Sequence, residues 1–276
     1  MYRLTRSAYL IVVTLPLGSI ALEAQVAGGV TAGAFTWEDG RREQALGTVF
    51  QVAPARWLLL GAVPTLLRVQ SSPAADPRFG VGDLPVYAAL VHAGRGATRP
   101  TLALTASASL PTGDSDRGLG RGVSVVSSEL AAGIDPAPGL TLRAGGARLL
   151  RVAGESPQGL ATSTIFGDVV VGSGAQTSIS LGAFGELRGN APAAYEPARG
   201  MSAAIAHTLR SGPTVVLGAG RSLAGVGPTW SFSLGIGTAF AGVAPVGATA
   251  PVSRATGGLP RGGRSLTPPL CAIAAC

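Results

Sequence analysis

Large apolar residues alternate with small or polar residues along most of the chain. The pattern is clearest at residues 229–240, where the even positions are Trp, Phe, Leu, Ile, Thr and Phe and the odd positions are Thr, Ser, Ser, Gly, Gly and Ala. Successive side chains of a β-strand point to opposite faces, so this segment predicts a strand with one apolar and one polar face. A soluble sheet turns its apolar face to a core, whereas an outer-membrane barrel turns that face outward to lipid.

The same alternation predicts about twelve antiparallel strands, separated by Gly, Pro, Asp and Asn. Each has roughly ten residues, which is the length that a tilted strand needs to cross a bilayer. The predicted strands are 26–37, 44–53, 57–69, 83–93, 101–110, 122–133, 139–150, 163–171, 177–189, 200–210, 213–222 and 229–240.

The connections between these strands alternate in length. If the first strand runs outward, one side has the turns 54–56, 94–99, 135–138, 172–176 and 211–212, and the other has the longer loops 70–82, 111–121, 151–162 and 190–199, with 39–43 and 223–228 shorter. Short periplasmic turns and longer extracellular loops are typical of outer-membrane barrels. We therefore predict an all-β fold, a transmembrane antiparallel β-barrel in the bacterial outer membrane. The alternative is a secreted or surface-exposed β-sandwich, an adhesin-like structural protein.

Both ends of the chain differ from the strand region. Two arginines and a short apolar run predict a cleaved secretory signal peptide over residues 1–24. The barrel is expected over residues 25–240, followed by a Gly-, Pro- and Ala-rich tail, 241–276, that is expected to be disordered. Cys271 and Cys276 lie in this tail, too late in the chain to form a disulfide framework.

The composition narrows the choice of partners. Charged residues make up 13% of the 276 residues, about half the share that is usual in soluble domains. The chain has no lysine and its arginines are scattered singly, so the net charge of +7 does not indicate nucleic-acid binding. We expect outer-membrane lipid, the outer-membrane assembly machinery and small-molecule solutes as partners, and no cofactor. The residues expected to form aromatic girdles at the membrane interfaces are Trp37, Trp57, Trp230, Phe50 and Phe240.

Three short Gly-rich motifs lie in the middle of the chain: GVGDL at 80–84, LPTGD at 110–114 and GLGRG at 118–122. Together with the closing segment 227–237, they resemble the outer-membrane family named for the meta-pathway of phenol degradation, over about residues 80–240. The resemblance implies a β-barrel, an outer-membrane location and a transport role. It does not imply phenol chemistry in this chain.

The Gly-Asp pairs of these motifs are typical of turns, because glycine adopts positive φ angles and aspartate accepts local backbone hydrogen bonds. Asp114 and Asp116 also offer two carboxylates to a cation. Two ligands on one loop make an incomplete cation site, so turn formation is the expected role.

No motif for catalysis stands out. The chain has no lysine for a Walker loop, no His-Glu-x-x-His and no Gly-x-Ser-x-Gly. A barrel hydrolase would need a histidine beside a serine and an acid, which leaves His92 and His207 as candidates near the short-turn ends of two strands. The expected function is therefore not enzymatic.

Charged residues on the polar faces are the candidate lumen residues. Glu129 and Arg143 flank the predicted turn 135–138 symmetrically, so we expect them to face each other as a cross-strand ion pair. About twelve strands should enclose a narrow pore or a closed cavity, in which such charges form a constriction that selects solutes. The predicted function is passive transport of small solutes, hydrophobic or aromatic ones among them. The predicted lumen-facing set is Glu129, Arg143, Asp168, Glu186 and Arg188.

Overall fold

The computed structural model describes residues 25–55, 57–92, 100–151, 162–173, 176–187, 197–225 and 228–237. The predicted signal peptide, the tail and both cysteines lie outside these residues. Every element in the described ranges is a β-strand. None of these residues belongs to a helix that is long and apolar enough to cross a membrane.

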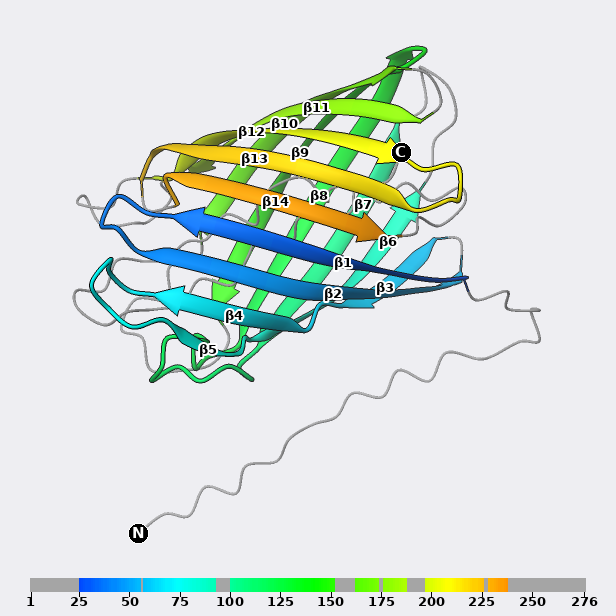
Figure 1. Ribbon diagram of the computed structural model, residues 1–276. Helices are drawn as coiled ribbons and strands as arrows, with labels where there is room; N and C mark the ends of the chain where they lie inside the picture. The colour runs from blue at the N-terminus through cyan, green and yellow to red at the C-terminus, as the bar shows by residue number, and fades with distance from the viewer. Residues whose placement is uncertain are drawn as a thin grey trace.

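The strands form one antiparallel sheet that closes on itself, because β1 pairs with both β2 and β14 (Figure 1). A closed sheet leaves no unpaired edge, and it rules out the two-layer sandwich that was the alternative prediction. The strands are β1 Gln25–Thr36, β2 Arg42–Ala55, β3 Leu58–Ala62, β4 Thr65–Gln70, β5 Arg78–Val81, β6 Leu84–His92, β7 Thr101–Leu110, β8 Val125–Ala137, β9 Leu140–Arg151, β10 Thr162–Ser173, β11 Thr177–Leu187, β12 Arg199–Thr208, β13 Thr214–Ala224 and β14 Trp230–Gly237.

The fourteen segments make twelve wall strands, because two of the strands are interrupted. β3 and β4 are halves of one strand, broken at Val63 and Pro64, and β5 and β6 are halves of the next, broken at Gly82 and Asp83. Proline has no N–H to give to a strand ladder, and a glycine inside a strand often marks a bend. β2 pairs with both halves of the first broken strand. The prediction of a barrel of about twelve antiparallel strands is confirmed.

The connections are short at one end of the barrel, the short-turn end, and longer at the other, the long-loop end. At the short-turn end, which faces the periplasm, residues 138–139 join β8 to β9 and residues 209–213 join β12 to β13. At the long-loop end, residues 111–124 join β7 to β8. Gly139 has a φ of 74°, a left-handed conformation that permits the tight β8–β9 turn.

The two faces of the wall have opposite chemistry. On β14, Trp230, Phe232, Leu234 and Ile236 are 42–53% exposed, whereas the serines and glycines between them are half-buried or buried. Every strand exposes at least one large apolar side chain on this outer face. A soluble protein rarely exposes so wide an apolar surface, but the outside of a membrane barrel requires one. The apolar face therefore meets lipid, and the polar face lines the lumen.

Aromatic residues at the two rims divide between lipid and lumen. Trp230, at the long-loop end, is exposed on the outer surface, as interfacial tryptophans are, and Trp57, at the short-turn end, is 55% exposed. Trp37 instead packs beside the buried Phe35, with 6.2 Å between ring centroids, and Arg41 lies 4.9 Å from its ring centroid. Trp37 thus joins the inner face, and its assignment to the lipid-facing girdle is corrected.

Arginine substitutions on the two faces of β11 test which face of the wall meets lipid. Leu181 is 61% exposed near the middle of the strand, and Ser180 is its inward-facing neighbour. Leu181→Arg should lower the free energy of unfolding by about 2–4 kcal/mol, the cost of arginine at the bilayer midplane. Ser180→Arg should cost much less, because its side chain extends into the lumen. Equilibrium denaturation in phospholipid vesicles measures both values, and equal losses would contradict the assigned faces.

Candidate functional site in the barrel lumen

The inner face of the wall carries mainly small and hydroxyl-bearing side chains. Ser178 and Ser180 of β11 face inward, and Ser107 of β7 shares a 2.5 Å hydrogen bond with Ser127 of β8. Larger inward-facing groups fall into three sets, which are aromatic rings, charged side chains and one inserted loop. These three sets give the lumen its chemistry.

Three inward-facing aromatic rings lie on glycines of the neighbouring strand. A β-carbon built on each of these glycines would lie less than 3.0 Å from the opposing ring, closer than real β-carbons come. The glycine therefore allows the ring to lie against the wall instead of being pushed into the lumen. The directly paired residues are Tyr87 with Gly61, Phe166 with Gly145, and Phe184 with Gly200.

The rings occupy two parts of the inner wall. Tyr87 packs against an apolar cluster on β1, β2, β3, β6 and β7, and its hydroxyl accepts a hydrogen bond from the side-chain amide of Gln51. Phe166 and Phe184 form a second cluster with the buried Ala131. Apolar and aromatic surface thus alternates with hydroxyl groups around the lumen.

Arg143 forms its ion pair with Asp168, not with Glu129. The Arg143 Nε donates to Asp168 Oδ1 at 2.7 Å, across directly paired positions of β9 and β10. Glu129 lies opposite Ala147, four positions from where the predicted pairing put it. The predicted Glu129–Arg143 pair is therefore wrong. β8 continues past residue 133 to Ala137 with a bulge after Ile134, and this moves the turn to residues 138–139.

The other predicted charges lie on a different level of the lumen. Glu129, Ala147, Thr164 and Glu186 form one row of directly paired inward positions across β8 to β11. The Arg143–Asp168 pair lies four residues nearer the short-turn end, which is about 13 Å along the strands. Glu186 is buried, and its Oε2 accepts a hydrogen bond from the backbone N–H of Ala198 at 2.9 Å. Glu129 forms no hydrogen bond or ion pair with a described residue.

Arg188 lies outside the described residues, so the predicted set of five is placed only in part. The described members make two levels, with the carboxylates of Glu129 and Glu186 toward the long-loop end and the ion pair below them. Whether these charges select solutes stays a prediction.

Asp83 connects the three Gly-rich motifs, which are far apart in sequence. Its side chain is fully buried at the break between β5 and β6. Its Oδ1 accepts the backbone N–H of Gly113 at 3.1 Å, and its Oδ2 accepts that of Arg121 at 2.8 Å. Thr112 Oγ1 also donates to the carbonyl oxygen of Gly82 at 2.9 Å. We call this set of contacts the Asp83 latch, and it fastens the loop 111–124 to the wall.

The latched loop inserts Leu119 into the barrel at the long-loop end. Leu119 is only 2% exposed and packs among Phe35, Ala45, Leu67 and Val69 on the inner faces of β1, β2 and β4. The loop therefore covers this part of the lumen wall. Asp114 in the same loop forms the local contacts that are typical of a turn, because one of its side-chain oxygens accepts hydrogen bonds from two backbone N–H groups.

The histidines lie on the outer face. His92 ends β6 and His207 lies near the end of β12, both toward the short turns, and both are exposed. His207 Nδ1 shares a 2.8 Å hydrogen bond with the hydroxyl of Thr177. β6 and β12 are not neighbours in the sheet, so the two histidines do not share a site. The described residues contain no group of three or more His, Cys, Asp or Glu that could hold a metal ion.

Solved structures of outer-membrane channels share this fold. The chain matches the COG4313 outer membrane channel from Pseudomonas putida F1 with a TM-score of 0.64 and 16% identity, over 80% of this chain and 97% of the channel. It matches the KdgM porin with a TM-score of 0.51 and 9% identity, over 78% of this chain and 99% of the porin. No protein-family model matches the chain, and no curated protein sequence does. The fold and its lipid-facing surface make this chain a β-barrel of the bacterial outer membrane.

The Asp83 latch predicts that the loop 111–124 is released when the carboxylate is changed. Asp83→Asn replaces one acceptor oxygen with an amide that cannot accept, at a cost of about 1.5–3 kcal/mol for a charge-assisted hydrogen bond. If the cleavage rate is proportional to the population of protein with a released loop, trypsin should cut at Arg117 or Arg121 roughly tenfold to hundredfold faster in the variant than in the wild type.

Mass spectrometry of the tryptic fragments from folded protein in detergent micelles measures this cleavage. The matched control is Asp76→Asn, an exposed aspartate of the 71–77 loop, which should leave the rate unchanged. Equal cleavage of the Asp83→Asn and wild-type proteins would show that the latch does not hold the loop.

Proposed function

We propose that this barrel is a passive channel that carries small apolar or aromatic solutes across the outer membrane. The observation that carries the proposal is the set of lumen rings, Tyr87, Phe166 and Phe184, each lying against a glycine of the next strand. Tyr87 and Phe184 are half-buried, so part of each ring is open to the lumen, whereas Phe166 is buried beside Phe184. Aromatic surface favours contact with other apolar and aromatic groups.

The small size of the remaining lumen side chains supports passage over tight capture. A channel must bind its solute favourably enough to admit it and weakly enough to release it. Rings in two separate clusters, with hydroxyl groups between them, offer several weak contacts instead of one deep pocket. The likeness to outer-membrane channels supports the same role through the fold.

We also propose that the chain belongs to the family named for the meta-pathway of phenol degradation. The motifs GVGDL, LPTGD and GLGRG carry that resemblance, and in the structure they form one hydrogen-bonded unit around Asp83. Motifs that matched only by chance would have no reason to contact one another. Their shared contacts therefore support a common architecture in which the loop after β7 is fastened to the break between β5 and β6.

We propose that the lumen charges favour neutral or cationic solutes over anions. On the described inner face, Glu43 and Asp168 form ion pairs with Arg41 and Arg143, and Arg78 is a further inward-facing arginine. The row that contains Glu129 and Glu186 has no arginine among its directly paired positions on β8 to β11, and Arg188 is the predicted fifth member of the set. The KdgM porin has been observed in complex with disordered oligogalacturonate, which is a polyanion. The carboxylates of Glu129 and Glu186 disfavour such a cargo in this barrel.

Removing a lumen ring should weaken the retention of aromatic solutes. Phe184→Ala deletes an aromatic contact worth about 0.5–1.5 kcal/mol, so the apparent affinity for a small aromatic solute should fall roughly threefold to tenfold. Phe232→Ala is the matched control, because it removes the same ring from the outer face. Solute flux into liposomes measures the effect. A folded wild-type barrel that passes no solute would refute the channel proposal.

Neutralising lumen charges of opposite sign should shift ion selectivity in opposite directions. At about 10 Å in water, one charge changes the energy of a passing ion by about 0.4 kcal/mol, roughly a twofold change in its local concentration. Glu129→Gln should therefore reduce the preference for cations, and Arg143→Gln should increase it. Reversal potentials in planar bilayers under a salt gradient measure both, and shifts in the same direction would contradict a lumen location for these side chains.

A further inference from the structure

Arg42 and Arg221 mark a row of outward-facing positions at the long-loop end. Arg42, Thr36, Trp230, Arg221 and Met201 are directly paired in succession across β2, β1, β14, β13 and β12. Both arginines are exposed and share the face of large lipid-facing residues on their own strands. Three strand spacings separate them, a distance of about 14 Å. The guanidinium of Arg221 lies 5.1 Å from the ring centroid of Trp230.

On the described strands, the outer face carries arginines and almost no carboxylates, whereas the inner face carries both signs of charge. Neither Arg42 nor Arg221 forms an ion pair with a described residue. Outward-facing arginines all lie within four residues of the long-loop end of their strands, whereas the acidic strand residues turn inward, apart from Asp135 beside a short turn. The outward set is Arg42, Arg68, Arg148, Arg199 and Arg221, and the inward set is Glu43, Glu129, Asp168 and Glu186.

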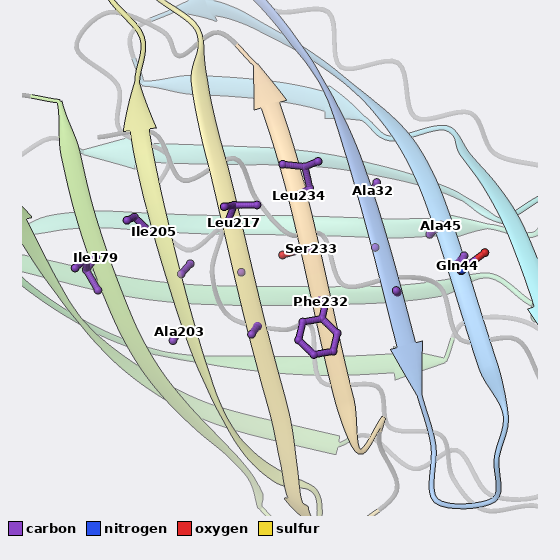
Figure 2. A pocket seen from close by; sticks show the side chains of 15 residues that line it. Ala32, Gln44, Ala45, Ile179, Ala203, Ile205, Leu217, Phe232, Ser233 and Leu234 are labelled. Atoms are coloured by element: carbon purple, nitrogen blue, oxygen red, sulfur yellow. The ribbon is translucent and has the colours of Figure 1, made fainter.

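An apolar depression begins directly beside the arginine row, toward the short-turn end. It lies on the outer face over β11 to β14, β1 and β2, and it is seen in Figure 2. Ala32, Ala34, Ala203 and Ala219 leave it hollow, and Phe232 and Leu234 line it where they project from β14. Phe232 is paired with Ala34 and Ala219, two residues along from the Thr36–Trp230–Arg221 row. Two cations and an apolar hollow are thus stacked in the order of a lipid headgroup and its acyl chains.

We propose that this surface binds lipid A, the phosphorylated glycolipid of the outer leaflet. Its disaccharide carries a phosphate at each end. One lipid A molecule can therefore place one phosphate at Arg42 and the other phosphate at Arg221. Arginine recognises phosphate through charge-assisted, bidentate hydrogen bonds, and basic residues at a membrane surface attract anionic headgroups. An acyl chain of the same molecule fills the hollow between the alanines. This site is on the lipid side of the wall and does not depend on the proposed channel function.

The long-loop location selects the outer leaflet over the periplasmic leaflet. The described arginines of the outer wall lie at the extracellular end, where Trp230 stacks parallel on Phe232 with 6.2 Å between ring centroids. A tryptophan at this level is typical of the interface between headgroups and acyl chains. Arg42 and Arg221 are therefore placed at headgroup depth with the apolar hollow deeper in the bilayer.

Native mass spectrometry of the folded, delipidated full-length chain tests the site. The protein is titrated with bis-phosphorylated lipid A and, separately, with the same lipid after removal of its phosphates. We expect a saturable complex with the phosphorylated form and binding that is at least about tenfold weaker without phosphates, the loss expected when charge-assisted hydrogen bonds are removed. Equal binding of the two lipids would overturn the proposal.

Variants locate the binding surface. The double variant Arg42→Gln/Arg221→Gln should weaken binding of phosphorylated lipid A at least about tenfold, and Ala219→Phe should weaken it by filling the hollow. The matched control is Arg148→Gln, on the outer face of β9 at the same end but away from the hollow, which should bind as the wild type does. Heat-modifiable gel migration checks that each variant is folded. If a variant fails to fold, the comparison of phosphorylated and dephosphorylated lipid A on the wild-type chain decides whether the proposal holds.

Two results would assign the surface to something else. If Arg148→Gln weakens binding as much as the double variant does, the arginines act only as a general positive surface and the proposed site is wrong. The wild-type spectrum could instead show a dimer that does not bind lipid A and that is dissociated by Ala219→Phe. In that case the hollow is an interface with a second copy of the chain, and the proposal is overturned.

Discussion

Closure of the sheet between β1 and β14 is the constraint on which the rest of this structure depends. The bilayer core offers no hydrogen-bond partner, so the N–H and C=O groups of the wall must pair within the sheet. The last ladder runs from Gly29 opposite Gly237 to Thr36 opposite Trp230. Once it is formed, the period of two assigns each wall residue to lipid or to lumen, and a slip by one residue would exchange the two faces. Alternation along the whole chain, more than any single residue, therefore determines the architecture.

This constraint explains which features could be predicted from the sequence. The number of strands, their faces and the gathering of the longest loops at one end follow from repeated local patterns, and the structure has all three. The Glu129–Arg143 pair could not be predicted, because the bulge after Ile134 and the turn at Gly139 shift the register by an amount that alternation does not encode. The ring contacts left a weak signal, since Gly61, Gly145 and Gly200 lie inside strands, where a glycine often marks a close approach. Without the register, the glycines could not be matched to their rings.

The Asp83 latch shows a second limit of local patterns. Its hydrogen bonds join residues 30 and 38 positions apart, so each Gly-Asp pair by itself indicated only a turn. In the barrel, the break between β5 and β6 interrupts a strand ladder, and a buried carboxylate accepts two backbone N–H groups from the loop 111–124 at that point. Burial of a charge is costly unless it is hydrogen-bonded, so Asp83 and the loop stabilise each other. Because Asp83 lies at the break and holds the loop that carries Leu119, the break also accounts for the packing of Leu119 against the inner wall.

The same alternation that separates apolar from polar side chains also keeps most carboxylates of the described strands on the inner face and puts five arginines on the outer face. We propose that the inward-facing carboxylates act on solutes in the lumen and the outward-facing arginines on lipid headgroups, with the barrel wall between them. The positive net charge is therefore no measure of what the lumen attracts. Arginine suits the outer positions better than lysine, because its planar guanidinium binds phosphate bidentately and stacks on rings, as Arg221 does on Trp230. On these two proposals, a chain without lysine that places arginines in this row holds anionic lipid outside while its lumen favours cations.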